Sequence, residues 1–212
     1  MPMLPKKNKP RSKRKPQISL DIFLEARNIF KKQKWKIKAG EGDTTFDDFC
    51  NMLSFLNSEQ QGCILELTKK FLRIDVGKYL HHIRRALANI DSEVLEGVST
   101  VYVFPLLPRE DYGKPKSSTF LAGFFSGREL RAEEILSVKS VHLLNRIDEV
   151  HSLTKSKNWF LLLVDDFIGS GETAEKALTD FAEETNIGLN KVAILSLVVQ
   201  KIGYERLISQ GV

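Results

Sequence analysis

Three short apolar runs in the second half of the chain constrain the fold most strongly. They are STVYVFPLL (99–107), NWFLLLVD (158–165) and KVAILSLVV (191–199), and each is nearly continuous rather than alternating. Strands that are covered on both faces have this composition, which is typical of parallel sheets. A helical pattern, TAEKALTDFAEETN (173–186), separates the last two runs and predicts a strand–helix–strand unit. We therefore expect an α/β fold with an open, mostly parallel sheet and flanking helices.

The second run leads directly into the stretch FLLLVDDFIGSGET (160–173). Ligands of open α/β sheets bind at the carboxyl ends of the strands, and the sequence places Asp165 and Asp166 at such an end. A glycine-rich turn and a helix start follow, where free backbone amides suit a phosphate. The residues of this turn and helix start are Gly169, Ser170, Gly171 and Thr173. Because the two carboxylates need hydroxyl donors or a divalent cation, the stretch predicts a ligand such as a ribose 5-phosphate, with Mg²⁺ nearby.

This stretch resembles the signature of the type I phosphoribosyltransferases. That signature is an apolar strand, two acidic residues, two mostly apolar residues and a Ser/Thr-Gly-x-Thr/Ser phosphate loop, and LLLVDDFIGSGET follows it throughout. The resemblance implies that Asp165 and Asp166 contact the ribose hydroxyls of 5-phosphoribosyl-1-pyrophosphate (PRPP) and hold Mg²⁺ indirectly. It also implies the residues that hold the 5-phosphate: Gly169, Ser170, Gly171, Glu172 and Thr173. The run DDFIGSGET is similar, too, to phosphoribosyltransferase-like domains of bacterial conflict and retron-associated defence systems, which implies an antiviral role.

Two other interpretations of the stretch do not involve PRPP. LLLVDD alone would suit the Walker B strand of a P-loop ATPase, but the sequence contains no GxxxxGK[ST] motif. The stretch would also suit an ordinary strand-to-helix turn, with Asp at the strand end and Gly for geometry. Two adjacent acids followed by a complete loop favour the phosphate site over such a turn.

A second loop, within FPLLPREDYGKPKSSTFLAGFF (104–125), follows the first run, where the family places its pyrophosphate loop. Its candidate ligands are three cations and two serines at an expected helix start: Arg109, Lys114, Lys116, Ser117 and Ser118. Cations and a helix start suit a pyrophosphate, so we expect Lys114 and Lys116 to act in catalysis with Asp165 and Asp166. A surface loop with scattered charge would account for the same residues.

The sequence departs from the family pattern at two places. The loop after the first run is longer and richer in proline than a compact pyrophosphate loop. Glu172 adds a carboxylate to the phosphate loop, where small or basic residues are commoner in the family. The resemblance therefore covers the ribose-phosphate site more closely than the pyrophosphate site.

Helical patterns dominate residues 18–95. Thr45 stands three residues before Asp48, and Ser58 three before Gln61, so both pairs resemble capping boxes at helix starts. The amphipathic run YLHHIRRALANI (79–90) continues the pattern. We expect a helical N-terminal region that can form the hood over a core at 96–212.

The positive charge is concentrated at the N-terminus. Residues 1–17 hold seven of the 32 Lys and Arg residues and no acid, which leaves 25 basic against 27 acidic residues elsewhere. Four prolines and few apolar groups predict a disordered basic tail. Such a tail either solubilises the protein or binds nucleic acid through its phosphates.

Apolar runs also exclude some classes of protein. None approaches the roughly 18 residues that a membrane span needs, and no apolar stretch follows the basic N-terminus. We therefore expect no membrane insertion and a cytoplasmic location.

After residue 199 the sequence predicts one more short helix around YERLIS (204–209), whereas the family has a further strand. The chain is then a piece of a longer protein, a partner supplies the missing edge, or the sheet is reduced. Three functions stay open: a phosphoribosyltransferase with an unidentified acceptor, a PRPP- or nucleotide-sensing module, and an effector tethered to nucleic acid through residues 1–17.

Overall fold

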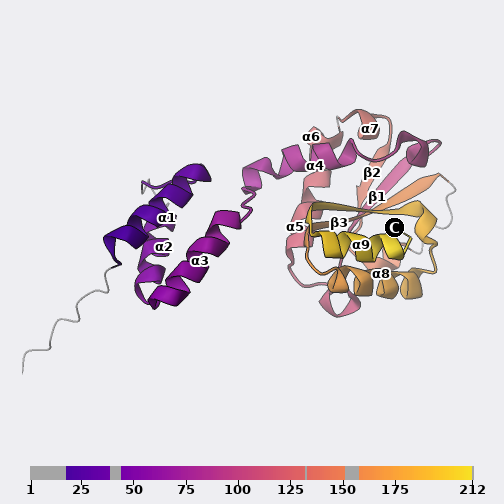
Figure 1. The fold of residues 1–212 in the computed structure, drawn as a ribbon. Helices are drawn as coiled ribbons and strands as arrows, with labels where there is room; N and C mark the ends of the chain where they lie inside the picture. Colours follow the sequence, from indigo (N-terminus) through magenta and orange to yellow (C-terminus); the bar gives the residue numbers. More distant parts are fainter. Residues whose placement is uncertain (1–17, 39–43, 132, 151–157, 212) are drawn as a thin grey trace, which may run out of the picture. The chain divides into compact units, whose positions relative to one another are not determined.

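The computed structural model describes residues 18–38, 44–131, 133–150 and 158–211 (Figure 1). The predicted disordered tail, residues 1–17, lies outside these ranges. The chain divides into two compact units, Met1–Arg73 and Ile74–Val212. No helix within the described ranges is both long and apolar enough to cross a membrane.

The described residues of the N-terminal unit form three helices: α1 (Leu20–Lys32), α2 (Thr45–Ser54) and α3 (Ser58–Lys70). They enclose one apolar core: Ala26, Ile29, Phe30, Phe46, Leu53 and Leu65. The helices begin one residue earlier than the predicted capping boxes. Asn57 and Gln60, rather than Ser58 and Gln61, exchange the side-chain and backbone hydrogen bonds of the capping box of α3, and Thr44 rather than Thr45 is the N-cap of α2.

The C-terminal unit is built on a parallel sheet of four strands: β1 (Thr100–Pro105), β2 (Ser140–Leu143), β3 (Trp159–Ile168) and β4 (Val192–Val199). Their order is β2-β1-β3-β4, and every neighbouring pair is parallel. The predicted α/β fold is confirmed at this level, and the assignment to the type I phosphoribosyltransferases stays a prediction. The sequence does not predict β2, because SVHL is short and its first side chains alternate between exposed and buried.

The helical elements of this unit are α4 (Tyr79–Leu87), α5 (Ser117–Gly123), α6 (Arg128–Arg131), α7 (Glu134–Ser137), α8 (Glu172–Thr185) and α9 (Lys201–Ser209). Short 3₁₀ turns lie at Val76–Lys78, Ser92–Leu95, Arg109–Asp111, Phe124–Ser126 and Leu189–Lys191. The turn at Arg109–Asp111 is labelled η3.

Side chains of β3 alternate between the two faces of the sheet. Leu161 and Leu163 pack in the cluster that contains the apolar face of α8. Leu162 and Val164 pack in the opposite cluster, which contains the apolar faces of α4 and α5. Because both faces are covered there, β3 is apolar at every position from Trp159 to Val164, which explains the continuous run in the sequence.

Helix α4 belongs to the C-terminal unit, so the predicted helical N-terminal region at 18–95 extends too far. Ile83 and Leu87 on its inner face are completely buried in the cluster on the sheet. The boundary between the units therefore falls between Arg73 and Ile74, because the apolar face of α4 is covered by the sheet.

Strand β4 forms one edge of the described sheet. The chain that follows it forms α9, and the described residues after β4 contain no further strand. A partner strand at this edge stays a prediction.

Candidate functional site

A cavity of about 520 Å³ opens where β1 and β3 stop pairing. The chain passes from β1 to β2 on one side, whereas β3 and β4 lie on the other side, so the strand order changes direction between β1 and β3. Ligands of open α/β sheets bind at this kind of point. The lining residues come from the loop after β1, the end of β3 and the start of α8.

The two predicted carboxylates line this cavity from within β3 rather than from beyond its end. Strand β1 pairs with β3 as far as Pro105, opposite Val164. Strand β3 continues to Ile168 beside β4 alone. Asp165 and Asp166 therefore stand just past the end of β1, where the sheet opens into the cavity.

Asp165 is half-buried, and its Oδ1 accepts a hydrogen bond from the backbone N–H of Asp166 at 2.9 Å. Burial, and after it the charge of Asp166, raises the pKa of Asp165 to about 7. Ionising both neighbouring carboxylates is unfavourable, because their charges repel and Asp165 is partly removed from solvent. A cation or a ligand with hydroxyl donors would stabilise the ionised pair.

Asp166 lies near Tyr79, a residue distant from it in the sequence. Alternation along β3 places Asp166 on the face covered by α4 and α5. There, burial and then the charge of Asp166 raise the pKa of Tyr79, the first residue of α4. The Tyr79 ring packs edge-on against Phe120 of α5, with centroids 6.2 Å apart. Only the packing of α4 on the sheet brings Tyr79 here, so no local sequence signal identifies it.

The predicted phosphate loop, residues 169–171, and the start of α8 form another wall of the cavity. Gly171 is the N-cap of this 14-residue helix, with a φ of 83°, and no side chain caps the first amides of the helix. Ser170 and Thr173 are exposed and also line the cavity. Uncapped amides and two hydroxyls at a helix start provide hydrogen-bond donors for a phosphate.

Helix α9 packs closely behind the phosphate loop. A Cβ atom on Gly203 would lie 2.4 Å from the carbonyl oxygen of Gly169 and 3.2 Å from the nitrogen of Gly171. Gly203 therefore lets α9 support the loop, and its sequence signal is a glycine within a helix, where glycine is unfavourable. Arg206 of the same helix lies 3.7 Å from a carboxylate oxygen of Glu172. Glu172 does not line the cavity.

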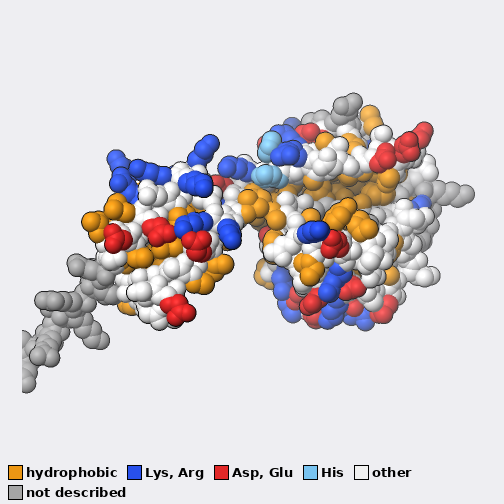
Figure 2. All heavy atoms as spheres, viewed as in Figure 1, with side chains coloured by type: hydrophobic (Ala, Val, Ile, Leu, Met, Phe, Trp, Pro, Cys, Tyr) orange, Lys and Arg blue, Asp and Glu red, His pale blue; other side chains and the backbone are white. Residues whose placement is uncertain are grey.

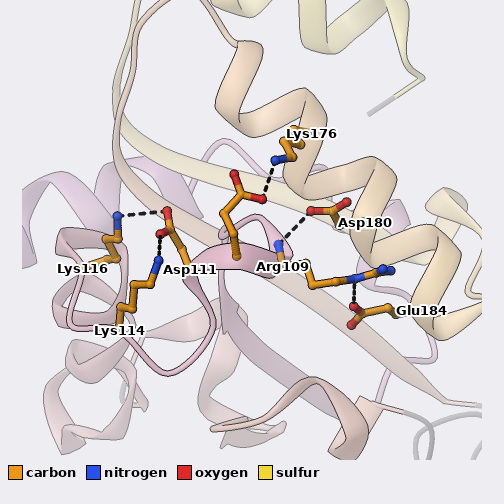
Figure 3. Close-up of polar contacts among 8 residues, drawn as sticks. Arg109, Asp111, Lys114, Lys116, Lys176, Asp180 and Glu184 are labelled. Carbon is orange, nitrogen blue, oxygen red and sulfur yellow. Dashed lines mark hydrogen bonds and ion pairs between the residues drawn. The ribbon is translucent and has the colours of Figure 1, made fainter.

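The other charged wall of the cavity is the loop after β1 (Figure 3). Asp111 forms ion pairs with Lys114 at 3.1 Å and with Lys116 at 2.9 Å. Lys116 lines the cavity, whereas Lys114 lines a different cavity, with Tyr112. Of the two predicted catalytic lysines, the structure thus brings Lys116 into the cavity with Asp165 and Asp166.

Arg109 is bound to α8 instead of lining the cavity (Figure 3). Its backbone N–H donates to Asp180 at 2.7 Å, and its guanidinium group pairs with Glu184. This hydrogen bond to Glu184 and the charge of Glu184 raise the pKa of Arg109. The adjacent Glu110 pairs with Lys176, also on α8. These contacts attach η3 to α8, the helix that follows the predicted phosphate loop.

Ser117 and Ser118, at the start of α5, line the cavity as well. Ser118 is 2 % exposed, and its Oγ has no hydrogen-bond partner among the described residues. A buried hydroxyl without a partner costs about 1–3 kcal/mol. A ligand oxygen in the cavity would provide the missing partner.

Carboxylates outnumber cations on the walls of the cavity: its ionisable side chains are Asp111, Asp165, Asp166 and Lys116. An anionic ligand would therefore be repelled unless a cation accompanied it. Within the described part of the chain, no group of three or more His, Cys, Asp or Glu side chains is arranged to hold a metal ion. A divalent cation here would need oxygen ligands from the bound molecule beside the protein carboxylates.

Comparison with family models, with curated proteins and with solved structures found no match for this chain.

Proposed function

We propose that the cavity binds PRPP together with Mg²⁺ and that the protein is a cytoplasmic phosphoribosyltransferase with an unidentified acceptor. The observation that carries this proposal is that two carboxylates and an uncapped helix start line one cavity. A phosphate alone has no use for the carboxylates, and a diol alone has no use for the helix start. A phosphorylated ribose uses both, and the resemblance of residues 160–173 to the phosphoribosyltransferase signature supports PRPP in particular.

The walls of the cavity suggest a role for each group. The backbone of 169–171 and the hydroxyls of Ser170 and Thr173 would hold the 5-phosphate. Asp165 and Asp166 would accept hydrogen bonds from the ribose hydroxyls. Lys116, Ser117 and Ser118 would face the pyrophosphate.

In the proposed reaction, an acceptor nitrogen forms a bond to C1 of PRPP while the bond from C1 to the pyrophosphate oxygen breaks. Pyrophosphate leaves with the electron pair, and the acceptor loses its proton to solvent. Positive charge develops on the ribose, so Asp165 and Asp166 would stabilise the transition state electrostatically. Mg²⁺ would supply neutralisation of the pyrophosphate charge.

Calorimetric titration with PRPP, with and without Mg²⁺, tests the binding step. We expect binding that depends strongly on Mg²⁺, because carboxylates outnumber cations in the cavity. Pyrophosphate release with purine, pyrimidine and nicotinate-like acceptors tests the transfer step. Absence of PRPP binding in the presence of Mg²⁺ would contradict both parts of the proposal.

One observation favours a second function, a PRPP-sensing module without catalysis. Of the three predicted pyrophosphate cations, Arg109 is bound to α8, Lys114 lines another cavity, and Lys116 is paired with Asp111. PRPP binding without pyrophosphate release from any acceptor would support the sensor. Tethering to nucleic acid through residues 1–17, an antiviral role and a partner at the edge of β4 stay proposals beside both functions.

A further inference from the structure

Lysines gather where α1 and α3 end in the N-terminal unit (Figure 2). A hydrogen bond of 2.9 Å from Nε2 of Gln33 to the carbonyl oxygen of Lys69 holds the two helix ends together. Five exposed lysines at these ends have no ion-pair partner among the described residues: Lys31, Lys32, Lys34, Lys38 and Lys70. The helix dipole stabilises cations near the C-terminal ends of helices. Two helix ends do not by themselves account for five such lysines.

The backbone at the end of α1 places a lysine where a glycine would be more favourable. The N–H of Lys34 donates to the carbonyl of Lys31, and that of Trp35 donates to the carbonyl of Phe30. This is a Schellman motif, whose left-handed position is usually glycine. Lys34 occupies that position with a φ of 57°, which is strained for a residue with a side chain. Strained positions with a charged, exposed side chain are candidates for function.

The same motif exposes an aromatic groove beside the lysines. Trp35 packs edge-on against Phe30, with centroids 5.1 Å apart, and against Phe71, with centroids 6.1 Å apart. Together with Phe49, Met52 and Leu67 these rings line a cavity of about 510 Å³. Phe71 is 59 % exposed and directly follows Lys70. Asp48 also lines the cavity. Its carboxylate accepts a hydrogen bond of 2.5 Å from the hydroxyl of Thr44.

We propose that this basic aromatic end of the N-terminal unit binds single-stranded nucleic acid. Cations beside the exposed ring of Phe71 and the half-buried ring of Trp35 match a polymer of phosphates and unpaired bases, because the lysines attract the backbone while bases stack on aromatic side chains. Trp35 and Phe71 are the stacking residues, and Lys34 and Lys70, each directly before one of them, are phosphate contacts. A duplex would satisfy only the lysines, because its bases already stack on each other. The inference is independent of the proposed PRPP site.

The test uses the full chain and the emission of its two tryptophans. Trp159 is 5 % exposed in the C-terminal unit, so a stacked base would quench Trp35 selectively. We expect oligo-dT and oligo-U of about 12 nucleotides, within the range of known single-strand sites, to quench the emission. The quenching should disappear in Trp35→Phe while that variant keeps most of its affinity.

The charge contribution is tested by Lys34→Gly with Lys70→Gln. Removing two phosphate contacts should weaken binding about tenfold or more and reduce the slope of log K against log salt by about 1.4. Lys34→Gly alone should bind more weakly and melt no lower than wild type, because glycine relieves the strained φ. This combination separates a binding lysine from a structural one, and Lys34→Asn provides a second variant suited to the same backbone. Lys201→Gln is the matched control, because Lys201 is 87 % exposed on α9 of the other unit.

Three outcomes would overturn the inference. The first is that Lys34→Gly with Lys70→Gln keeps the wild-type affinity and the wild-type slope of log K against log salt. The second is that the emission of Trp35 does not change at saturating oligonucleotide. Both would place nucleic-acid binding elsewhere, for example on residues 1–17. The third is tighter binding of a duplex, an acidic peptide or anionic vesicles than of the single strand. Phe71→Ala should weaken binding of the single strand without changing the salt slope, and a change of slope alone would count against stacking.

Discussion

The two charged walls of the cavity differ in how their polar groups are satisfied. The wall at 165–174 leaves the first amides of α8 without a side-chain cap and keeps two carboxylates side by side. In the loop after β1, the charges pair with each other or with α8, as Asp111 does with Lys116 and Arg109 with Glu184. Groups without partners are available to a ligand, whereas paired groups must first exchange a partner. If the cavity binds PRPP as proposed, we expect the first wall to contribute most of the affinity for PRPP and the second wall to modify it.

The carboxylate pair should give the largest effect. We expect Asp165→Asn with Asp166→Asn to lower PRPP affinity by at least about a hundredfold, because two hydrogen bonds to charged acceptors contribute about 1.5–3 kcal/mol each. Calorimetry measures the affinity. The melting temperature should not fall, because the variant removes a charge whose burial is unfavourable. Unchanged PRPP affinity in a folded double variant would remove the basis of the ribose site.

The backbone of the predicted phosphate loop should give an effect of comparable size. Gly171→Val should abolish phosphate binding, because valine resists a φ of 83° and its Cβ would lie 3.0 Å from the Cα of Gly203. Gly203→Ala tests the same contact from α9, since its new Cβ must displace the loop. Gly62→Ala is the control, because nothing lies within 4 Å of the added atom. A crystal structure with phosphate still held by the loop of the Gly171 variant would refute this prediction.

The paired wall should give smaller effects that differ between its two lysines. If the protein is an enzyme, Lys116→Ala should lower turnover about 10- to 1,000-fold, the scale of single electrostatic contributions in active sites. Lys114→Ala is the matched control, since it removes an equally paired lysine that lines a different cavity. Measuring pyrophosphate release beside PRPP affinity separates turnover from binding. Equal losses in both variants would show that the position of Lys116 in the cavity is not what matters.

Asp111→Asn tests the paired wall by a change that should raise PRPP affinity. It would free Lys116 and remove one carboxylate from the cavity, so PRPP affinity should rise, by up to about fivefold for a partly exposed pair. The dependence on Mg²⁺ should weaken as well. Lower PRPP affinity in Asp111→Asn would show instead that Asp111 positions Lys116 for the ligand.

The sequence predicts the first wall well because that wall is local. The apolar run, the acids and the loop are contiguous from 160 to 173, and the structure brings them into one cavity. Three strands follow from their composition, but β2 does not, since its four residues are held by pairing with β1. The structure confirms the α/β class, and the function stays a proposal.

The sequence predicts less of the second wall because its contacts are distant along the chain. Arg109 and Lys116 are both cations in one loop, and only the fold decides that Arg109 meets α8 while Lys116 lines the cavity. Gly203 and Tyr79 reach the site from α9 and α4 by packing alone. Spacing within a loop therefore indicates which residue types are available, and tertiary packing decides which of them can bind.

A further prediction is a dependence of the stability on pH that comes from Asp165. Its pKa is raised from the ordinary 3.8 to about 7 in the folded protein, so the folded state holds this proton more tightly than the unfolded state. The stabilisation is fully present below about 3.8 and is lost as the pH rises through about 7. The stability of wild type relative to Asp165→Asn should therefore fall as the pH rises over this interval and level off above it, as measured by chemical denaturation at each pH.

PRPP affinity should change with pH in the opposite direction to the stability. Mg²⁺ favours the ionised carboxylate, so the part of the PRPP affinity that depends on Mg²⁺ should increase as the pH rises through about 7. The phosphates of PRPP also titrate near pH 6, and Asp165→Asn provides the correction because it keeps the ligand and removes the group. Calorimetry at pH 6 and pH 8, values on either side of the raised pKa, gives the comparison. If the Asn variant shows the same pH dependence as wild type, the titration belongs to the ligand, and the first wall does not act through the protonation of Asp165.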